Sequence, residues 1–423
     1  SVVSTRSSLS SVSSSSSSSR ASSRHSTITV DEQMIEEYEL TKMPTNTTSS
    51  ISLPLPLLSL GTSSLLTKRN INDMERLVAG YRSMVGLAAN TGGLVPETNL
   101  GVLLQAWSGL IAAAGAQAPP RNLVHNDLNL AELNPLEVSK QLSLIESKLF
   151  LSITASELLH ENFMPKKAHL HQASNVGAIL SFTNLLSSYV IESIVGPGFG
   201  PKKRTGRLRS WMKIALSALY FRNFNSVAAI MTALQSHVVS RLSPLWSSLS
   251  SKDTELFEYL SKIVHPNNNY KVYRNKLKKL TDEYAVHGMP LVKSMVPVVP
   301  FFNLFLQDIT FINEGNTNFR NPDSFRPNKL INIDKYFKIT RTVSLIQFLQ
   351  VGYEVDGKPN FTGSRRDSFF NMGGSIDVDT KSITPVPLLQ EFILYEFWRV
   401  SMLYANDHDR GYNLSLQLVP KAG

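Results

Sequence analysis

PFFNLFLQDITFINEGN, residues 300–316, is the stretch that decides the fold of this protein. Its apolar residues recur three and four positions apart, which is the spacing of one face of an α-helix. They are Phe301, Leu304, Phe305, Ile309 and Ile312. A polar ridge on the opposite face recurs at intervals of four, three and four, through Asn303, Gln307, Thr310 and Glu314. We expect the apolar face to pack inward. Core packing does not require the polar ridge, so we expect the ridge to be available to a partner.

Glu314 lies in the last turn of this predicted helix, directly before Gly315. The helix macrodipole places partial negative charge at that end and disfavours a carboxylate there by a fraction of a kcal/mol. Exposed carboxylates are common on protein surfaces, so the position alone proves nothing. It does favour a functional reason for the residue.

Helical spacing continues along most of the chain. Two apolar stripes illustrate it: Leu142, Ile145, Leu149 and Ile153, and later Ile393, Phe397, Val400 and Tyr404. No long alternating pattern typical of strands occurs, and neither a solenoid repeat nor sustained heptads are found. The predicted fold class is therefore all-α, a globular helical bundle with irregular helix crossings.

The first part of the chain has a different composition. Residues 1–27 are mostly serine with scattered arginines, and residues 28–69 remain polar and rich in proline, serine and threonine. Such segments bury too little apolar surface to offset the entropy lost on ordering. We predict a disordered leader over residues 1–69 and a folded body over residues 70–423. The chain opens at Ser1 and not at methionine, so we also expect a region that precedes it.

One segment of the folded body, residues 100–118, is uncharged and roughly long enough to span a bilayer. Gln105, Ser108 and Gln117, together with three glycines, weaken membrane insertion. Alanine and leucine at this density also suit a helix buried between other helices. The favoured interpretation is a core or partner-facing helix, and a membrane-attached adaptor is the alternative.

The charge and the cysteine count bound the function. Lysine and arginine number 42 against 33 aspartate and glutamate, a net charge of +9 that suits an anionic partner but selects none. The chain has no cysteine, which excludes disulfides, cysteine nucleophiles and thiolate metal sites. Nothing at the start of the chain has the pattern of a signal peptide. A cytoplasmic protein is predicted.

A basic stretch over residues 202–209 follows the sequence GPGFG at residues 196–200. Its cations are Lys202, Lys203, Arg204, Arg207 and Arg209. No preceding strand, dinucleotide fingerprint or Walker ending accompanies the glycines, so a nucleotide-binding loop is not predicted. We expect a solvated loop between helices, with peripheral membrane contact as its candidate function. Nucleic-acid binding is not expected, because the stretch lacks interleaved aromatic residues for stacking.

His160, His169 and His171 lie close together, but no acidic residue or cysteine completes a familiar metal-binding spacing. Neither a GxSxG elbow nor an HExxH motif occurs in the chain. We therefore expect no metal, no cofactor and no hydrolase chemistry.

Residues 300–316 resemble the hallmark helix of the catalytic domain of Ras guanine-nucleotide exchange factors, which reads close to PFxGxYLxDLTFIxEGNP. Other landmarks of that family match in the same order. They are residues 134–142 for DPxExAxQLT, 182–190 for FNxxSxWV, 223–246 for NFNSxxAIxxALxSxxIxRLxxTW, 270–274 for YxxYR, 330–335 for LINFxK and 412–420 for YxxSLxxEP. The resemblance implies a catalytic domain over residues 131–423. A helical segment over residues 70–130 is expected to pack on it or brace it.

The resemblance also implies a protruding helical hairpin, residues 301–315 and 332–350. In the family this hairpin is inserted beside the nucleotide and magnesium site of a Ras-family small GTPase, which releases GDP without covalent chemistry by the exchange factor. By this analogy Thr310 obstructs the magnesium site, and the Glu314 carboxylate competes with the nucleotide phosphate.

The site residues that the resemblance implies fall into two groups. The catalytic group on the hairpin comprises Phe301, Asn303, Thr310 and Glu314. The GTPase-binding group comprises Tyr270, Gln235, Asn225, Gln307, Asn332 and Lys335. Packing in the core is the alternative interpretation for four of them, Tyr270, Phe301, Gln235 and Asn225.

Some positions depart from the family pattern. Asn303 replaces the usual glycine of the hairpin helix, and the closing EPR is Val419, Pro420 and Lys421. These changes leave open a catalytically weak domain that serves as a GTPase-binding scaffold in cell polarity or mitotic exit. The serine-rich leader is similar to that of fungal members that act on Ras or on the Rap-like GTPase of bud-site selection. Such a member is expected in the cytoplasm, recruited to the plasma membrane or the cell cortex.

Overall fold

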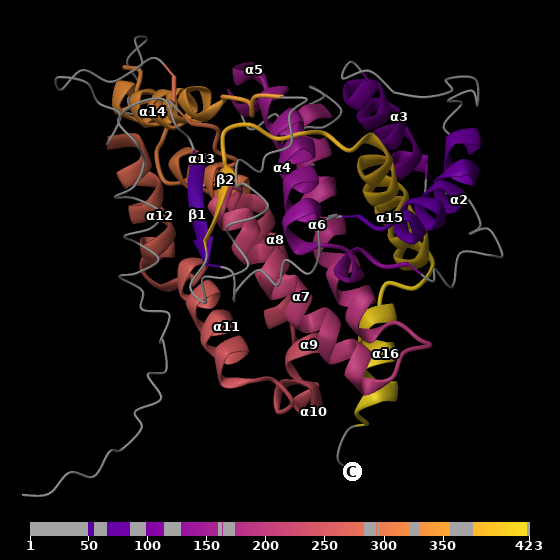
Figure 1. Ribbon diagram of the computed structural model, residues 1–423. Coiled ribbons are helices and arrows are strands. Elements are labelled where there is room, and N and C mark those ends of the chain that lie inside the picture. Colours follow the sequence, from indigo (N-terminus) through magenta and orange to yellow (C-terminus); the bar gives the residue numbers. More distant parts are fainter. Residues whose placement is uncertain are drawn as a thin grey trace, which may run out of the picture.

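The computed structural model describes residues 50–54, 66–84, 99–113, 128–159, 163, 174–282, 293–294, 296–320, 330–355 and 375–420. Within these residues the chain is a bundle of α-helices with one two-stranded ribbon (Figure 1). The all-α fold class predicted from the sequence is confirmed.

The chain before the hairpin consists of one strand followed by a series of helices. In chain order they are β1 (Ser50–Pro54), α2 (Lys68–Met84), α3 (Asn99–Ala113), α4 (Pro135–Leu151), α5 (Ala155–Leu158), α6 (Ser174–Val195), α7 (Pro201–Tyr220), α8 (Phe224–Gln235), α9 (His237–Ser240), α10 (Ser243–Trp246), α11 (Ser251–Ile263) and α12 (Asn267–Asp282). The remaining elements are α13 (Phe302–Glu314), α14 (Ile333–Leu349), β2 (Ser375–Asp379), α15 (Pro387–Asn406) and α16 (Arg410–Leu418). A 3₁₀ turn, Leu130–Glu132, precedes α4.

Helix α6 lies at the centre of the bundle and packs against α4, α7, α8 and α15. Phe182 of α6 contacts Phe397 of α15 at a ring-centroid distance of 4.9 Å, and Tyr189 meets Trp211 of α7 edge-on at 6.0 Å. By length and composition α6 could also cross a membrane, but 56% of its most apolar window is buried between these neighbours. An apolar helix covered in this way is the core helix of the bundle.

Side-chain caps set the starts of two helices that carry the core. Asn134 caps α4 and is followed by Pro135 in the first helical position, where the missing N–H of proline costs nothing. Asn223 caps α8 by accepting a hydrogen bond from the amide of Ser226. Both asparagines lie in motifs by which the sequence resembles its family, so these motif positions have a structural reason.

The two helices nearest the N-terminus, α2 and α3, pack against α15 (Figure 1). Arg82 of α2 donates to the Glu391 carboxylate at 2.6 Å, and the indole N–H of Trp107 in α3 donates to the carbonyl of Leu394 at 3.1 Å. The uncharged residues 100–118 thus contain a helix that packs on the bundle, as the favoured interpretation of the sequence held.

The ribbon joins two distant parts of the chain. β1 pairs with β2 in antiparallel register, with Ser50 opposite Asp379 and Pro54 opposite Ser375. β1 lies within the range that the sequence assigned to a disordered leader. Apart from residues 50–54 and 66–69, that leader lies outside the described residues, and the division of the chain at residues 69 and 130 stays a prediction.

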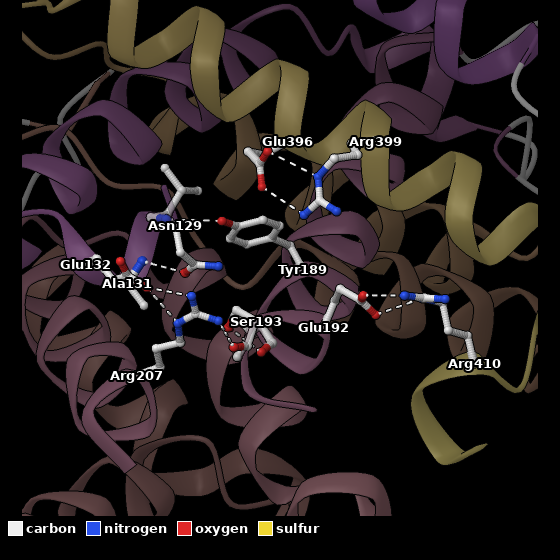
Figure 2. A network of polar contacts seen from close by, with 12 residues as sticks. Asn129, Ala131, Glu132, Tyr189, Glu192, Ser193, Arg207, Glu396, Arg399 and Arg410 are labelled. Atoms are coloured by element: carbon white, nitrogen blue, oxygen red, sulfur yellow. Dashed lines mark hydrogen bonds and ion pairs between the residues drawn. The ribbon is translucent and has the colours of Figure 1, made fainter. Parts of the chain in front are cut away.

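The basic stretch at residues 202–209 is helical, so the expectation of a solvated loop is wrong. α7 begins one residue before it, with a proline in the first helical position. Arg204 and Arg207 lie three residues apart, on one face of the helix, and both are buried. Arg207 donates to the Glu132 carboxylate and to the carbonyl of Ser193 (Figure 2). These arginines hold α7 to the bundle and are not exposed to a membrane.

Figure 2 shows two further ion pairs in the part of the bundle that contains Arg207. Arg410 of α16 pairs with Glu192 of α6 at 2.8 Å, and Arg399 pairs with Glu396 within α15 at 3.0 Å. Tyr189 lies between these groups, and burial raises its pKa well above the usual value. Buried charges that neutralise one another in this way fix how helices pack, because leaving any one of them unpaired is costly.

Candidate functional site

Helices α13 and α14 pack against each other and form a hairpin at one end of the bundle (Figure 1). The cap residues of α13 are Phe301 and Gly315, and those of α14 are Asn332 and Gln350. The predicted hairpin, residues 301–315 and 332–350, is therefore present with the expected bounds.

The inner face of α13 is buried, as its apolar spacing predicted. Leu304, Phe305 and Ile309 are 5% exposed or less. Of the other two residues predicted to pack inward, Phe301 and Ile312 are half-buried. The hairpin therefore has a packed side and leaves part of its surface uncovered.

Main-chain hydrogen bonds fix the base of the first arm. Val299, just before the hairpin, pairs in parallel with the chain at the start of α8. Its N–H donates to the carbonyl of Arg222 at 3.1 Å, and its carbonyl accepts from the N–H of Phe224 at 2.8 Å. The end of the second arm is held by Gln350, whose side-chain amide donates to the carbonyls of Phe150 and Ile153 at 2.9 and 2.8 Å.

A buried polar network lies under the start of α13. The Glu146 carboxylate of α4 is fully buried and accepts hydrogen bonds from Asn223, Asn225 and Ser226 of α8. Burial raises the pKa of Glu146 above its usual value, and these hydrogen bonds partly offset the rise. The Oδ1 atom of Asn225 also accepts from the N–H of Phe302 at 3.4 Å, which connects the network to the hairpin.

Asn225 is therefore placed differently from its prediction. It is 0% exposed, and its side-chain N–H groups donate to Glu146 and to Thr183. This burial does not fit the predicted contact with a GTPase, because the side chain has no surface to offer. The residue instead positions the first turn of the hairpin helix.

Two aromatic residues predicted to face the partner meet at the base of the hairpin. Tyr270 and Phe301 are half-buried and pack edge to face, with ring centroids 5.6 Å apart. Tyr273 lies behind them and accepts a hydrogen bond from the Phe301 amide at 2.9 Å. Phe301 is thus packed on one side and accessible on the other, and its predicted contact with a GTPase stays a prediction.

The turn that carries Tyr270 has unusual backbone geometry. Asn268, Asn269 and Tyr270 have φ angles of 50°, 57° and 57°, in the left-handed region. Asparagine tolerates this region, but for a bulky side chain such as tyrosine it is an outlier. Outliers of this kind persist where surrounding contacts impose them, and they cluster at functional sites.

The outer face of α13 carries the predicted polar ridge in part. Gln307 and Glu314 are exposed, whereas Thr310 and Asn303 are half-buried. The Thr310 hydroxyl donates to the carbonyl of Leu306 at 3.0 Å, within its own helix. Between the exposed polar residues lies Phe311, which is 57% exposed and which the sequence analysis did not single out.

Asn332 and Lys335, two predicted GTPase contacts at the tip, make their hydrogen bonds within the hairpin instead. The Asn332 side-chain amide donates to the carbonyl of Thr317 at 2.9 Å. Lys335 is buried, and its ammonium group donates to Asn313 and Asn318 at 3.0 and 2.8 Å. The burial of Lys335 argues against its predicted contact with a partner, because its charge is used to close the turn between the two arms.

Gln235 is exposed. It is the last residue of α8, ten positions after Asn225. Ten residues of α-helix rise about 15 Å, so the two predicted contacts lie at opposite ends of α8. Gln235 is therefore separated from Asn225, and its predicted contact with a GTPase stays a prediction.

Exposed apolar side chains gather at the tip and were missed by the sequence analysis. They are Leu330, Ile331, Ile333, Tyr336 and Phe337, with exposed fractions between 40% and 71%. Ile333 and Phe337 lie four residues apart and therefore on one face of α14. The sequence could have indicated this, because these two apolar residues share one face of α14 and lie outside the apolar stripe that the helix buries.

The three histidines considered as metal ligands, His160, His169 and His171, lie outside the described residues. Among the described residues, no group of three or more histidine, cysteine, aspartate or glutamate side chains could hold a metal ion.

Comparison with known proteins places these features in context. Residues 137–337 match the model of the RasGEF domain. The chain is 31% identical over 290 residues to "Bud site selection protein 5" of Saccharomyces cerevisiae, covering 68% of this chain and 36% of that protein. It is 28% identical over 266 residues to "Ras guanine nucleotide exchange factor M" of Dictyostelium discoideum, covering 63% and 25%. It is 28% identical over 229 residues to "Cell division control protein 25" of Saccharomyces cerevisiae, covering 54% and 13%. The chain thus spans about a third or less of the length of these relatives.

Proposed function

Because residues 137–337 of this chain are a RasGEF domain, we propose that the protein promotes the release of GDP from a Ras-family small GTPase. The observation that carries the proposal is the hairpin of α13 and α14. Its base is fixed by the buried Glu146–Asn225 network, and its outer face leaves Gln307, Phe311 and Glu314 exposed. A rigid base with an uncovered face suits an element that must enter another protein without deforming.

The proposed mechanism needs no bond to be made or broken by the exchange factor. Glu314, exposed at the end of α13, would place its carboxylate where the GTPase holds the nucleotide phosphate. Thr310 would occupy the space of the magnesium ion. Since phosphate and magnesium contacts supply most of the nucleotide affinity, removing them weakens GDP binding.

Exchange then follows from thermodynamic linkage. A factor that binds the nucleotide-free GTPase more tightly than the loaded form must weaken nucleotide binding by the same factor. The hairpin is thereby a competitor of the nucleotide. The excess of GTP over GDP in the cell gives the reaction its direction.

For the partner, we propose Ras itself or a Rap-like GTPase of bud-site selection. The names of two relatives, a bud site selection protein and a cell division control protein, support these two choices. We further propose that the protein acts in the cytoplasm and reaches the plasma membrane or cell cortex through its GTPase. Recruitment through residues 202–209 is not part of the proposal, because Arg204 and Arg207 are buried and Lys202 and Lys203 alone are exposed among its five cations. Loss of cortical localisation when the GTPase is deleted would support this route, and retention would contradict it.

The test is release of fluorescent GDP from a panel of Ras, Rap, Ral and Rho GTPases. We expect acceleration of a Ras-branch member and loss of most of it in Glu314→Ala. The matched control is Glu258→Ala, which removes an exposed carboxylate of α11, a helix distant from the hairpin in sequence. No acceleration of any GTPase, or equal loss in the two variants, would contradict the proposed mechanism.

A second candidate function, a GTPase-binding scaffold with weak exchange activity, is favoured by one observation. Among the described residues, the Asn303 Oδ1 atom is buried and accepts no hydrogen bond. An amide in place of the glycine that the family carries here adds bulk and an unsatisfied acceptor to the helix that would have to enter the GTPase. A stable complex with the nucleotide-free GTPase, without faster GDP release, would support the scaffold over the exchange factor.

A further inference from the structure

One guanidinium group connects the left-handed turn before the hairpin to the hairpin helix itself. Arg274 of α12 donates from Nε to the carbonyl of Asn269 at 2.8 Å, and from a terminal nitrogen to the Asn269 side chain at 3.2 Å. The two terminal nitrogens also donate to both carboxylate oxygens of Asp308 in α13, at 2.8 and 2.9 Å. The pair is therefore bidentate, the geometry that fixes orientation as well as distance.

The contacts of Arg274 act on the backbone conformation of the turn. The carbonyl of Asn269 lies inside the left-handed segment, where the helical hydrogen-bond pattern of α12 is interrupted. Tyr270, the next residue, keeps its left-handed conformation and packs against Phe301. Arg274 thus donates hydrogen bonds to Asn269 in the turn and, at the same time, to the Asp308 carboxylate in α13.

The position of Asp308 in α13 connects the turn to the exposed face of the hairpin helix. Asp308 follows Gln307 directly and precedes Phe311 by three residues, so it borders the exposed face of the helix. A rotation of α13 about its axis would lengthen both hydrogen bonds of the bidentate contact, because each needs its own donor and acceptor in line. The ion pair is thus sensitive to the orientation of the hairpin helix.

We propose that Arg274 is a positioning residue for exchange: through Asp308 it locks the Tyr270 turn to α13 and fixes the angle at which the hairpin meets the GTPase. This inference rests on the proposed exchange function. Neither Arg274 nor Asp308 needs to touch the GTPase for it to hold. The two side chains are 33% and 25% exposed, so water screens part of their attraction, and we expect the pair to hold α13 locally without adding much to the global free energy of unfolding.

The experiment compares Arg274→Met, Asp308→Asn and the double variant with the parent chain. The matched control is Arg209→Met, which removes a similarly exposed pair, Arg209 with Asp253 at 2.7 Å, between α7 and α11. Two properties are measured: kcat and KM of GDP release with the responding GTPase, and amide hydrogen exchange of residues 302–314 in the free protein. The melting temperature reports whether each variant folds.

We expect each single variant to lower kcat about tenfold with little change in KM, because the contact surface is kept and only its orientation is lost. The double variant should be no slower than Arg274→Met, since that variant already removes the contact with Asp308. Amides of α13 should exchange faster in all three, and Arg209→Met should change neither property. Arg274→Lys, which keeps the charge but loses the bidentate geometry, should fall between the parent and Arg274→Met.

Four outcomes would overturn the inference. Additive losses in the double variant would mean that the two residues act separately. A lower kcat with unchanged hydrogen exchange would make Arg274 a direct GTPase contact. Unchanged kcat and hydrogen exchange would make the pair an ordinary surface ion pair, and equal effects in Arg209→Met would indicate general loosening. If the parent chain accelerates no GTPase, the proposed function fails, while the hydrogen exchange of α13 still decides whether the pair holds the hairpin.

Discussion

Tyr270 and Phe301 meet edge to face at the base of the hairpin, with ring centroids 5.6 Å apart and ring planes at 85°. They come from two elements, the left-handed turn of α12 and the residue that precedes α13. Edge-to-face pairs add about 0.5–1.5 kcal/mol to the free energy of packing beyond area burial. Because both rings are half-buried, the pair can support the hairpin and still present an aromatic surface to a partner.

Phe301→Ala is expected to lower the exchange rate by about tenfold or more, since a half-buried aromatic residue at a rigid base is a typical binding hot spot. It should cost only about 1–2 kcal/mol of unfolding free energy, less than a fully buried phenylalanine. GDP release and urea denaturation measure the two effects. A stability loss with normal exchange per folded molecule would assign Phe301 to the core alone.

Phe311→Ser is expected to reduce exchange about tenfold, because Phe311 offers its apolar surface between Gln307 and Glu314. The side chain is 57% exposed, so the free energy of unfolding should change by about 0.5 kcal/mol or less. Val102→Ser in α3, where the side chain is 51% exposed, is the control. Equal exchange rates in the two variants would remove Phe311 from the partner surface.

Glu146→Gln is expected to change the pH dependence of stability. Burial raises the pKa of Glu146 in the folded protein above the value of 4.5 expected in the unfolded chain. Between those two values the folded state binds more protons than the unfolded state, so the free energy of unfolding falls as pH rises through that window. The glutamine variant should lack this fall. Denaturation curves from about pH 4 to pH 8 test it, and identical profiles for the two proteins would contradict it.

Asn303→Ala is expected to raise the free energy of unfolding by about 1 kcal/mol, because it removes a buried amide oxygen without a partner and introduces a better helix former. Exchange should stay within about twofold of the parent rate. A tenfold loss without a change in stability would make Asn303 a direct contact. Asn303→Gly restores the family residue, and a gain of exchange in that variant would favour the scaffold interpretation of the parent chain.

Much of the hairpin could be predicted from the sequence. The apolar spacing of residues 300–316 predicted which side of α13 packs inward, and Leu304, Phe305 and Ile309 are buried accordingly. The bounds of both arms were available from the motif resemblance. Helix periodicity and capping are local properties, so a single sequence reports them directly.

Prediction of individual contacts was less successful, for a physical reason. Asn225 and Lys335 are polar residues in recognisable motifs, and the sequence analysis assigned both to the partner surface. In the structure both are buried because each satisfies groups from a distant segment: Asn225 connects Glu146 to Phe302, and Lys335 closes the turn at Asn313. A motif position shows that a residue matters, but not whether its partner lies inside or outside the chain.

The same limit explains the basic stretch at residues 202–209. Its composition suggested a solvated loop, whereas Arg204 is buried against the carbonyl of Ile194 and Arg207 against Glu132 and Ser193, and Glu132 lies 75 positions before Arg207. Charged residues are buried only when a partner is brought to them. That partner cannot be identified from the stretch itself.

The sequence by itself determined the all-α class and the side of α13 that faces the core, because these follow from spacing within one helix, while the bounds of the hairpin followed from the motif resemblance. Only the tertiary structure decided which polar residues are exposed, how Arg274 joins the Tyr270 turn to Asp308, and that exposed apolar residues gather at the tip. These features depend on contacts between residues far apart in the chain. Burial and hydrogen bonding of a side chain are set by what folds against it, and local sequence does not record that.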